Sequence, residues 1–176
     1  MRRFPGRFAL MPALSFVLLL AGCQAPTPKA AENAAVSSVD AVSVVGGYMA
    51  AWNAHNAEKA ASYMTDDVVY YDAAVGTAQV SRDSAQKNVI QAFLTAVPDC
   101  QWVRDTTPPI IGTDGVAFQW TFSGTHTGPF ADGTPATGKK FSFKGATLIR
   151  LRGDKIAFQG DFYDGYGFFK QLGLAK

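Results

Sequence analysis

The segment "GDFYDGYGFFKQLGL", residues 160–174, places two aspartates, Asp161 and Asp164, among aromatic side chains. A carboxylate buried without a partner is costly, so each must face water, pair with a donor or lie in a cavity. An apolar cavity disfavours the charged form of a carboxyl group and raises its pKa. Such a group suits proton transfer near neutral pH, so this segment is the first candidate for acid/base chemistry.

The alternation of a β-strand separates the two aspartates. Alternate residues of a strand share a face, which puts Gln159, Asp161 and Tyr163 on one side and Phe158, Phe162 and Asp164 on the other. Only one of the two carboxyl groups can therefore line a given cavity. Asp161 is the catalytic candidate and Asp164 its competitor. The alternative for Asp161 is an edge position bound to a loop or to Arg150 or Arg152.

Several other residues could take part in chemistry or in structure. His126 lies in a glycine-rich loop, where it is either a turn residue bonded to the backbone or part of a site. Asp72 follows an aromatic pair and either reaches the mouth of a cavity or forms a surface turn. His55 and Cys100 are expected to be structural. With two histidines and no cluster of cysteines or glutamates, we expect no metal site.

Aromatic residues recur through the chain and could wall a pocket or simply form the core. The candidates for walls and hydrogen-bond donors are Tyr48, Trp52, Tyr70, Trp120 and Tyr163. The sequence leaves both possibilities open for each of them.

The elements that must position these residues begin with helices. Apolar and aromatic residues at three- and four-residue steps predict a helix over residues 40–55. Asn56 can cap a short second helix that carries Ala60, Tyr63 and Met64. A β-rich stretch follows at residues 66–76, and Ser81 can cap a third helix that Pro98 ends.

The second half changes to the period of β-strands. In "GVAFQWTFSG" the apolar residues alternate, and residues 139–164 read as a hairpin turning at Arg152, Gly153 and Asp154. An earlier strand is expected near residues 101–104. Helices first and antiparallel strands afterwards predict an α+β fold with helices on one face of a curved sheet.

The chain resembles the SnoaL-like polyketide cyclase, or ester cyclase, branch of the nuclear transport factor 2-like superfamily. The resemblance rests on "GTHTG" (124–128), "TGK" (137–139) and "KQLG" (170–173). It implies an α+β cone in which N-terminal helices pack on a strongly curved antiparallel or mixed sheet, with an apolar cavity and no cofactor. It also implies that Asp161 matches the general acid/base of a cofactor-free aldol ring closure, and that homodimers are possible. A non-catalytic protein that holds a small hydrophobic ligand or a peptide in the same cavity is the alternative.

The N-terminus predicts export. Three arginines precede an apolar run that ends in Leu20-Ala21-Gly22-Cys23, which resembles the lipobox of bacterial lipoproteins. We therefore expect a signal peptide (1–22), lipidation at Cys23, a tether (23–38) and one domain (39–176). Gln24 after the cysteine favours the outer membrane, facing the periplasm, with the lipid as the only membrane contact.

Charge argues against nucleic acid as a partner. The chain has 16 Lys and Arg against 14 Asp and Glu, but three of the arginines precede Cys23, which leaves the mature chain at −1. The basic residues between 139 and 155 are better explained as the solvated face of a hairpin. The expected partner is a small, mostly apolar molecule.

Overall fold

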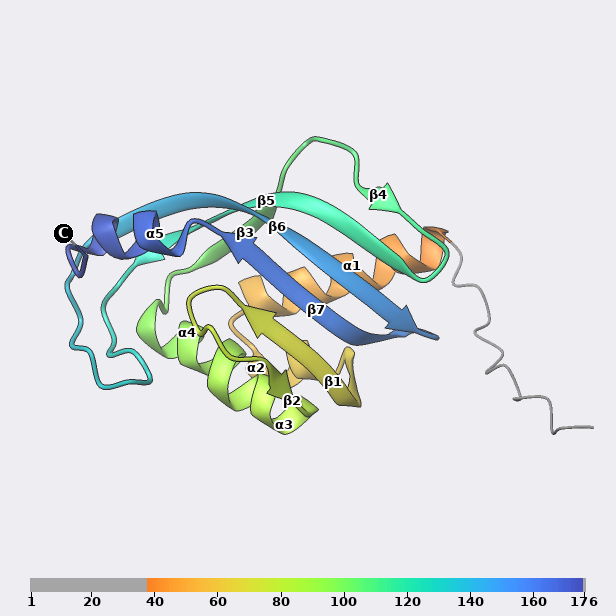
Figure 1. Ribbon diagram of the computed structural model, residues 1–176, viewed down its shortest axis with the longest axis horizontal. Helices are drawn as coiled ribbons and strands as arrows, with labels where there is room; N and C mark the ends of the chain where they lie inside the picture. Colours follow the sequence, from red (N-terminus) through yellow and green to blue (C-terminus); the bar gives the residue numbers. More distant parts are fainter. Residues whose placement is uncertain (1–37, 176) are drawn as a thin grey trace, which may run out of the picture. The chain divides into compact units, whose positions relative to one another are not determined.

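A computed structural model describes residues 38–175 (Figure 1). Helices α1 (Ser38–Asn53) and α2 (Ala57–Ala61) come first, followed by strands β1 (Met64–Asp72) and β2 (Gln79–Val80). A continuous helical stretch then comprises α3 (Arg82–Ala85), the π-helical segment η1 (Gln86–Gln91) and α4 (Ala92–Ala96). The last elements are β3 (Gln101–Arg104), β4 (Ile110–Ile111), β5 (Gly115–Thr125), β6 (Lys140–Arg152), β7 (Lys155–Tyr163) and α5 (Gly165–Leu172).

The strands form one mixed sheet in the order β2-β1-β7-β6-β5-β3, with β4 also paired to β5. All pairs are antiparallel except β1 and β7, which run parallel. In Figure 1 the long strands β5 to β7 curve over α1 and the α3–α4 stretch, which cover the inner face. The expected α+β fold with helices on one face of a curved sheet is confirmed.

The predicted helices are present, with two errors of extent. The first helix ends at Asn53, so His55 lies beyond it. Asn56 caps α2 and Ser81 caps α3, each accepting a hydrogen bond from a backbone N–H of the first turn. Tyr63 and Met64, which we assigned to the second helix, lie beyond it, and Met64 begins β1. Tyr63 packs on Tyr48 instead, and the edge of its ring fills the space beside Gly47.

The strand periodicity is confirmed on the inner face of the sheet. Val116, Phe118, Trp120 and Phe122 are all buried. The alternation around Asp161 also holds, because Gln159 and Asp161 are buried while Phe162 is half exposed on the outer face. The parallel pairing of β1 with β7 was not predicted, and it matters most for the site.

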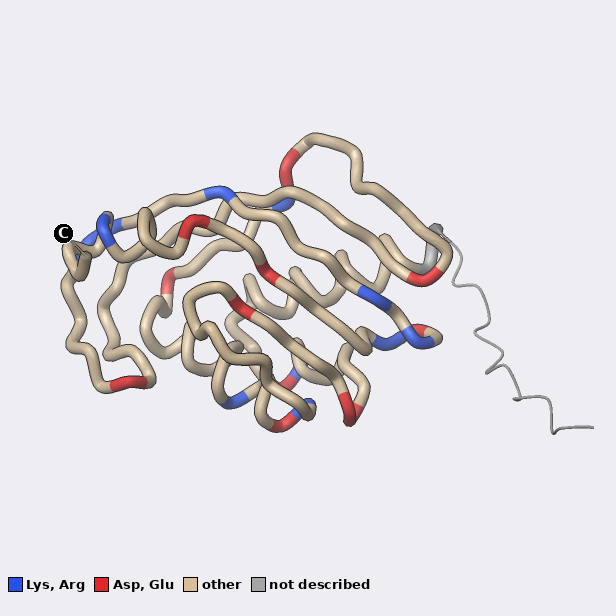
Figure 2. Tube along the Cα trace, in the orientation of Figure 1, with Lys and Arg blue, Asp and Glu red and all other residues tan. Residues whose placement is uncertain are grey.

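The basic residues of the hairpin lie mainly toward solvent. Arg150 pairs with Asp114, and Arg152 pairs with Asp67. The end of the β6–β7 hairpin carries the corresponding blue positions in Figure 2. The side-chain partners of Asp161 are Tyr70, Thr147 and Gln159 and include neither arginine, which argues against the edge-residue alternative for that carboxyl group.

Among residues 38–175, no helix combines the length and the apolar character needed to cross a bilayer. The proposed signal peptide, Cys23 and nearly all of the tether lie outside the described residues, so those assignments stay predictions.

Candidate active site

A polar row crosses the middle of the inner face of the sheet. Strand register places Asp72 on β1 beside Asp161 on β7, and Asp161 beside Thr147 on β6. All three side chains are buried. Figure 2 shows the two acidic positions on β1 and β7 next to each other within the sheet. Because β1 and β7 run parallel in this register, two carboxyl groups from distant parts of the chain share one interior face.

Asp161 is held by three uncharged side chains. Tyr70 Oη donates to Asp161 Oδ2 at 2.7 Å, Gln159 Nε2 donates to the same oxygen at 2.9 Å, and Thr147 Oγ1 donates to Oδ1 at 2.5 Å. Burial raises the pKa of Asp161 to about 7, with a further contribution from Asp72, while the three hydrogen bonds oppose the rise. The carboxyl group can therefore either take up or release a proton near neutral pH.

Thr147 connects Asp161 to the aromatic wall. Its hydroxyl accepts from Trp120 Nε1 at 2.7 Å and donates to Asp161, which fixes the direction of both bonds. The indole reaches Thr147 because its cross-strand neighbour is Gly145. A Cβ at Gly145 would lie 2.4 Å from the Trp120 ring, so a side chain there would displace the indole.

Asp72 is held by a different set of donors. Its Oδ1 accepts from the backbone N–H of Ala74 at 2.9 Å, from that of Val75 at 3.1 Å and from Tyr163 Oη at 2.9 Å. Burial raises the pKa of Asp72, and these hydrogen bonds oppose the rise. The carboxyl group closes the turn that follows β1, so it has a structural task besides any chemical one.

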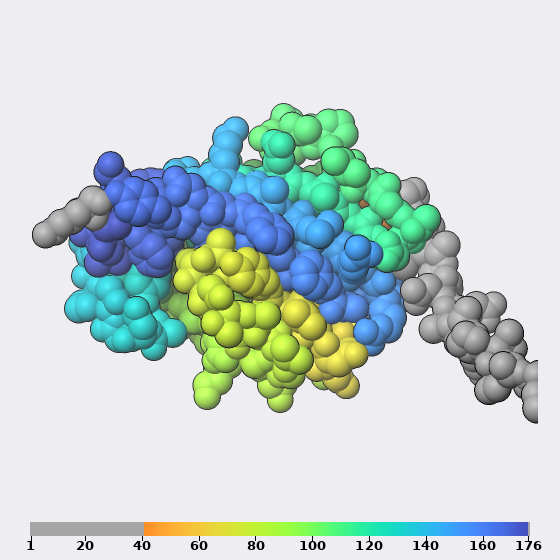
Figure 3. Space-filling view, viewed as in Figure 1, coloured from red at the N-terminus to blue at the C-terminus, as the bar shows by residue number. Residues whose placement is uncertain are grey.

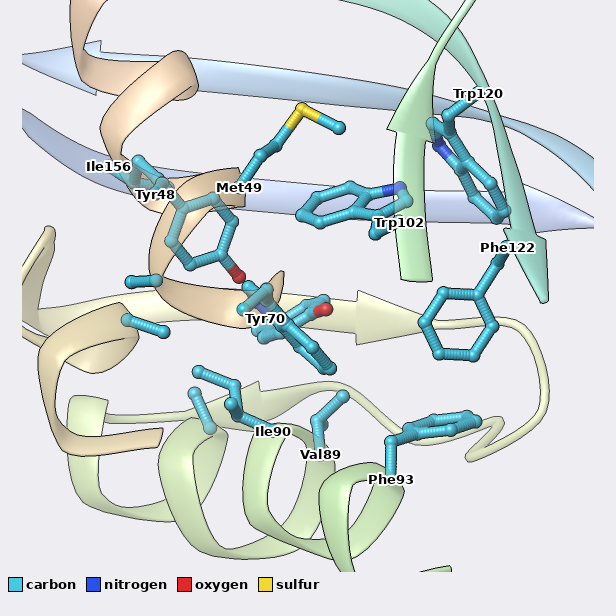
Figure 4. Packing of buried hydrophobic residues seen from close by; sticks show 14 of the residues in the cluster. Tyr48, Met49, Tyr70, Val89, Ile90, Phe93, Trp102, Trp120, Phe122 and Ile156 are labelled. Carbon is cyan, nitrogen blue, oxygen red and sulfur yellow. The ribbon is translucent and has the colours of Figure 1, made fainter. Parts of the chain in front are cut away.

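An aromatic cavity of about 30 Å³ adjoins both carboxyl groups. Figure 4 shows Tyr70, Trp102, Trp120 and Phe122 from the sheet facing Phe93 on the opposite helix. The lining residues are Trp52, Tyr70, Asp72, Phe93, Trp102, Trp120, Phe122, Phe143, Asp161 and Tyr163. Six of the candidates from the sequence thus line one space: Trp52, Tyr70, Asp72, Trp120, Asp161 and Tyr163.

Three buried polar atoms lie close to one another beside the cavity. Trp52 Nε1, Tyr48 Oη and Gln159 Oε1 make no hydrogen bond of standard geometry among the described residues. Trp52 and Gln159 are nevertheless near enough to Tyr48 to act on its pKa as hydrogen-bond partners, against the larger rise that burial causes. Of the three residues only Trp52 lines the cavity, and a buried polar group without a well-aligned partner is costly.

The remaining candidates lie elsewhere. Asp164 is exposed and caps α5, accepting from Gly167 N at 2.8 Å, so it does not line the cavity. His126 is buried beneath Phe130, at 4.1 Å between ring centroids, and accepts from the backbone N–H of Thr137. The turn alternative for His126 is therefore the one the structure favours. Burial lowers the pKa of His126.

The other reactive side chains have structural contacts. Cys100 is buried, and its burial raises the thiol pKa to about 11. His55 Nε2 lies 3.0 Å from the carbonyl oxygen of Cys100. Within residues 38–175, no cluster of three or more His, Cys, Asp or Glu side chains could hold a metal ion.

The sequence did not identify Thr147 and Gln159 as partners of Asp161. Four aromatic residues of the cavity wall were also not among the candidates: Phe93, Trp102, Phe122 and Phe143. Gln159 shares the strand parity of Asp161, and that parity was the available signal. Thr147 carried no such signal, because both faces of β6 hold large side chains.

The match to a family model settles the relationship. The SnoaL-like polyketide cyclase model matches residues 42–172, which is most of the chain. The chain belongs to this family. Among curated proteins, none is similar enough in sequence to count as a relative.

Solved structures agree with the family fold. AclR from Streptomyces galilaeus, described as a candidate hydroxylase, is 23% identical to this chain, with a TM-score of 0.66 over 80% of this chain and 100% of AclR. A candidate SnoaL-like polyketide cyclase from Jannaschia sp. CCS1 is 16% identical, with a TM-score of 0.68 over 78% of this chain and 94% of the cyclase. IdmH, a candidate polyketide cyclase from Streptomyces antibioticus, is 23% identical, with a TM-score of 0.62 over 75% of this chain and 97% of IdmH. At these identities the likeness concerns the fold.

Proposed function

We propose that this SnoaL-like protein is a cofactor-independent acid/base catalyst that acts on a small, mostly apolar carbonyl compound, as a cyclase, isomerase or lyase. The observation that carries the proposal is Asp161, a buried carboxyl group on the cavity wall whose pKa lies at about 7 and whose partners are all uncharged. A base with such a pKa combines a useful ionised fraction with the strength to accept a proton.

The proposed reaction begins with the ionised form of Asp161. A carboxylate oxygen takes a proton from the carbon next to the substrate carbonyl, and the electrons of the broken C–H bond form an enolate. In a ring closure, the enolate carbon attacks a second carbonyl of the same molecule, and the proton on Asp161 passes to the resulting alkoxide. The carboxylate is thereby restored, and no oxidant or reductant is consumed.

Trp52 is the proposed donor to the developing oxyanion. Trp52 lines the cavity, and an indole N–H that turns from Tyr48 to the substrate oxygen would stabilise its developing negative charge. The mostly aromatic walls lower the local dielectric constant, which strengthens this interaction.

The cellular setting is also a proposal. The Leu-Ala-Gly-Cys pattern supports export and lipidation at Cys23, with the domain in the periplasm at the outer membrane. Exposed apolar residues on the outer face of the sheet, among them Val103, Leu148 and Phe162, support a homodimer through that face. Both are compatible with the enzymatic proposal.

A binding protein without catalysis is the second candidate. The observation in its favour is the size of the cavity, because about 30 Å³ admits little more than a water-sized group beside Asp161. A pocket of this size could hold the end of a ligand without turning it over.

Proton abstraction can be tested without knowing the natural substrate. A panel of aryl ketones and β-keto esters is incubated with the protein in D₂O, and mass spectrometry measures deuterium gained next to the carbonyl above the buffer rate. We expect exchange by the wild type, and a fall of at least about 100-fold for Asp161→Asn. Asp164→Asn, the same change on an exposed carboxylate, is the matched control and should retain exchange. Equal exchange by Asp161→Asn and wild type would exclude Asp161 as the base. Binding of panel members without exchange would favour the binding protein.

A further inference from the structure

A second, larger cavity of about 280 Å³ lies beside the aromatic one. We call it the outer chamber and the 30 Å³ cavity the inner chamber. Phe130, Phe168 and Phe169 form the aromatic wall of the outer chamber, and Ala131, Asn88 and Asp132 line it from exposed positions. Figure 3 shows where its segments meet: the C-terminal helix, the loop of residues 126–138 and the turn after β1.

Phe93 separates the two chambers. It is the one residue that lines both within the described chain, and it is 9% exposed. On the inner side its ring meets Phe122 edge to face, at 6.0 Å between centroids (Figure 4). The turn after β1 links the chambers as well, because Asp72 lines the inner one while Ala74 and Val75 line the outer one.

Volume and charge restrict what such a pair of chambers can hold. Sites for organic ligands usually enclose about 300 to 1,000 Å³, which the outer chamber approaches and the inner chamber does not. Among the described residues, the charged side chains that line the two chambers are all acidic: Asp72 and Asp161 inside, Asp132 outside. An anionic ligand would therefore meet repulsion and gain no ion pair.

We propose that the outer chamber binds the apolar body of the substrate, with Phe93 as the gate through which its carbonyl end reaches Asp161. The substrate class is an uncharged or cationic ketone with a ring system of about two rings, a size that fits the outer volume. The carbonyl position rests on the proposed function, whereas the occupancy of the outer chamber does not.

The test uses matched ligands and the full-length protein. The neutral ketone 2-acetylnaphthalene and the anion 2-naphthoate have the same ring system and differ in charge. Binding is followed by tryptophan fluorescence, because Trp52, Trp102 and Trp120 line the inner chamber, and by calorimetry. We expect the ketone to bind at least about tenfold more tightly than the anion. Equal or tighter binding of 2-naphthoate would overturn the proposal.

Charged variants locate the ring system. Ala131→Asp, at an exposed lining position, and Phe169→Asp, at a half-buried one, should each weaken binding of 2-acetylnaphthalene at least about tenfold. Ile110→Asp, at an exposed apolar position on β4 that lines neither chamber, is the matched control and should leave the Kd within about twofold of wild type. If Ala131→Asp binds the ketone as tightly as Ile110→Asp does, the ring system lies elsewhere and the proposal fails.

The gate has its own readout. Phe93→Ala joins the chambers, so we expect it to favour the three-ring ketone 2-acetylphenanthrene over acetophenone by about tenfold more than the wild type does. An unchanged preference would exclude Phe93 as the gate. If the ketones bind as expected but gain no deuterium, only the enzymatic proposal is wrong. If deuterium exchange occurs but Ala131→Asp does not change it, only the proposal that the outer chamber binds the substrate is wrong.

Discussion

Two tyrosine–aspartate pairs cross diagonally between β1 and β7, and the two carboxyl groups are held in different ways. Tyr70 on β1 donates to Asp161 on β7, and Tyr163 on β7 donates to Asp72 on β1. The other donors to Asp161 are the side chains of Thr147 and Gln159, whereas the other donors to Asp72 are backbone N–H groups. The two carboxyl groups are therefore similarly buried, but the groups that donate to Asp161 can reorient more easily than those that donate to Asp72.

This difference assigns separate tasks to the two carboxyl groups. Loss of the charge on Asp72 weakens hydrogen bonds that hold the turn after β1 in place. The hydroxyl of Tyr70 and the amide of Gln159 can rotate as the protonation of Asp161 changes, while Trp120 orients the hydroxyl of Thr147. Asp161 is thus the better group to exchange protons, and Asp72 adds negative charge beside it that raises its pKa. Three changes test this comparison.

The largest effect is expected from Asp161→Asn on the pH dependence of stability. The folded pKa of about 7 exceeds the ordinary 3.8, so the folded state retains a proton that the unfolded state has lost between these values. The free energy of unfolding contributed by this group is greatest below pH 3.8 and falls as pH rises to about 7, by roughly 4 kcal/mol. In Asp161→Asn this fall should disappear, and the variant should exceed the wild type in stability above pH 7.

Urea unfolding at intervals from pH 4 to 8 measures this difference. Asp164→Asn serves as the control, because Asn caps a helix about as well as Asp does and the wild-type fall should persist. A fall of the same size in Asp161→Asn would mean that another group titrates in this range and that Asp161 is not the buried acid.

The second effect comes from Thr147→Val, which keeps the shape of the side chain and removes its hydroxyl. Trp120 Nε1 loses its acceptor and Asp161 Oδ1 loses a donor. Unpartnered buried groups cost about 1–3 kcal/mol, so unfolding should become easier by that amount, and the pKa of Asp161 should rise further. Thr147→Ser should restore most of both. Equal stability of the valine and serine variants would show that the hydroxyl contributes nothing.

Much of this architecture was readable from local pattern. Alternation around Asp161 correctly separated it from Asp164, and the caps at Asn56 and Ser81 are where the residue types indicated. Five of the proposed pocket residues, together with Asp161, line the inner chamber. The strand alternation and the helix caps share a cause, since each follows from the period of one element or from the chemistry of one turn.

The remaining features depend on contacts between distant segments. The parallel register of β1 and β7 brings Asp72 beside Asp161, and no local signal specifies the register of strands so far apart in sequence. Thr147 becomes a partner of Asp161 only because β6 pairs with β7 in this register. Gly145 leaves room for the indole of Trp120, a contact between two strands that neither strand predicts by itself. His126 could not be assigned from its loop, because its contact with Phe130 is tertiary.

The smallest effect, and the sharpest test of the comparison, is Asp72→Asn. All three hydrogen bonds that Asp72 receives end on Oδ1, which the amide oxygen of Asn can replace, so the turn after β1 should persist with weaker hydrogen bonds. The change then removes charge alone, and the pKa of Asp161 should fall toward its ordinary value, because Asp72 now contributes to its rise. Carbon-13 NMR titration of the labelled aspartate carboxyl groups follows this directly. An unchanged or higher pKa would mean that burial by itself sets the acidity of Asp161, and Asp72 would then be a turn residue without influence on the proposed base.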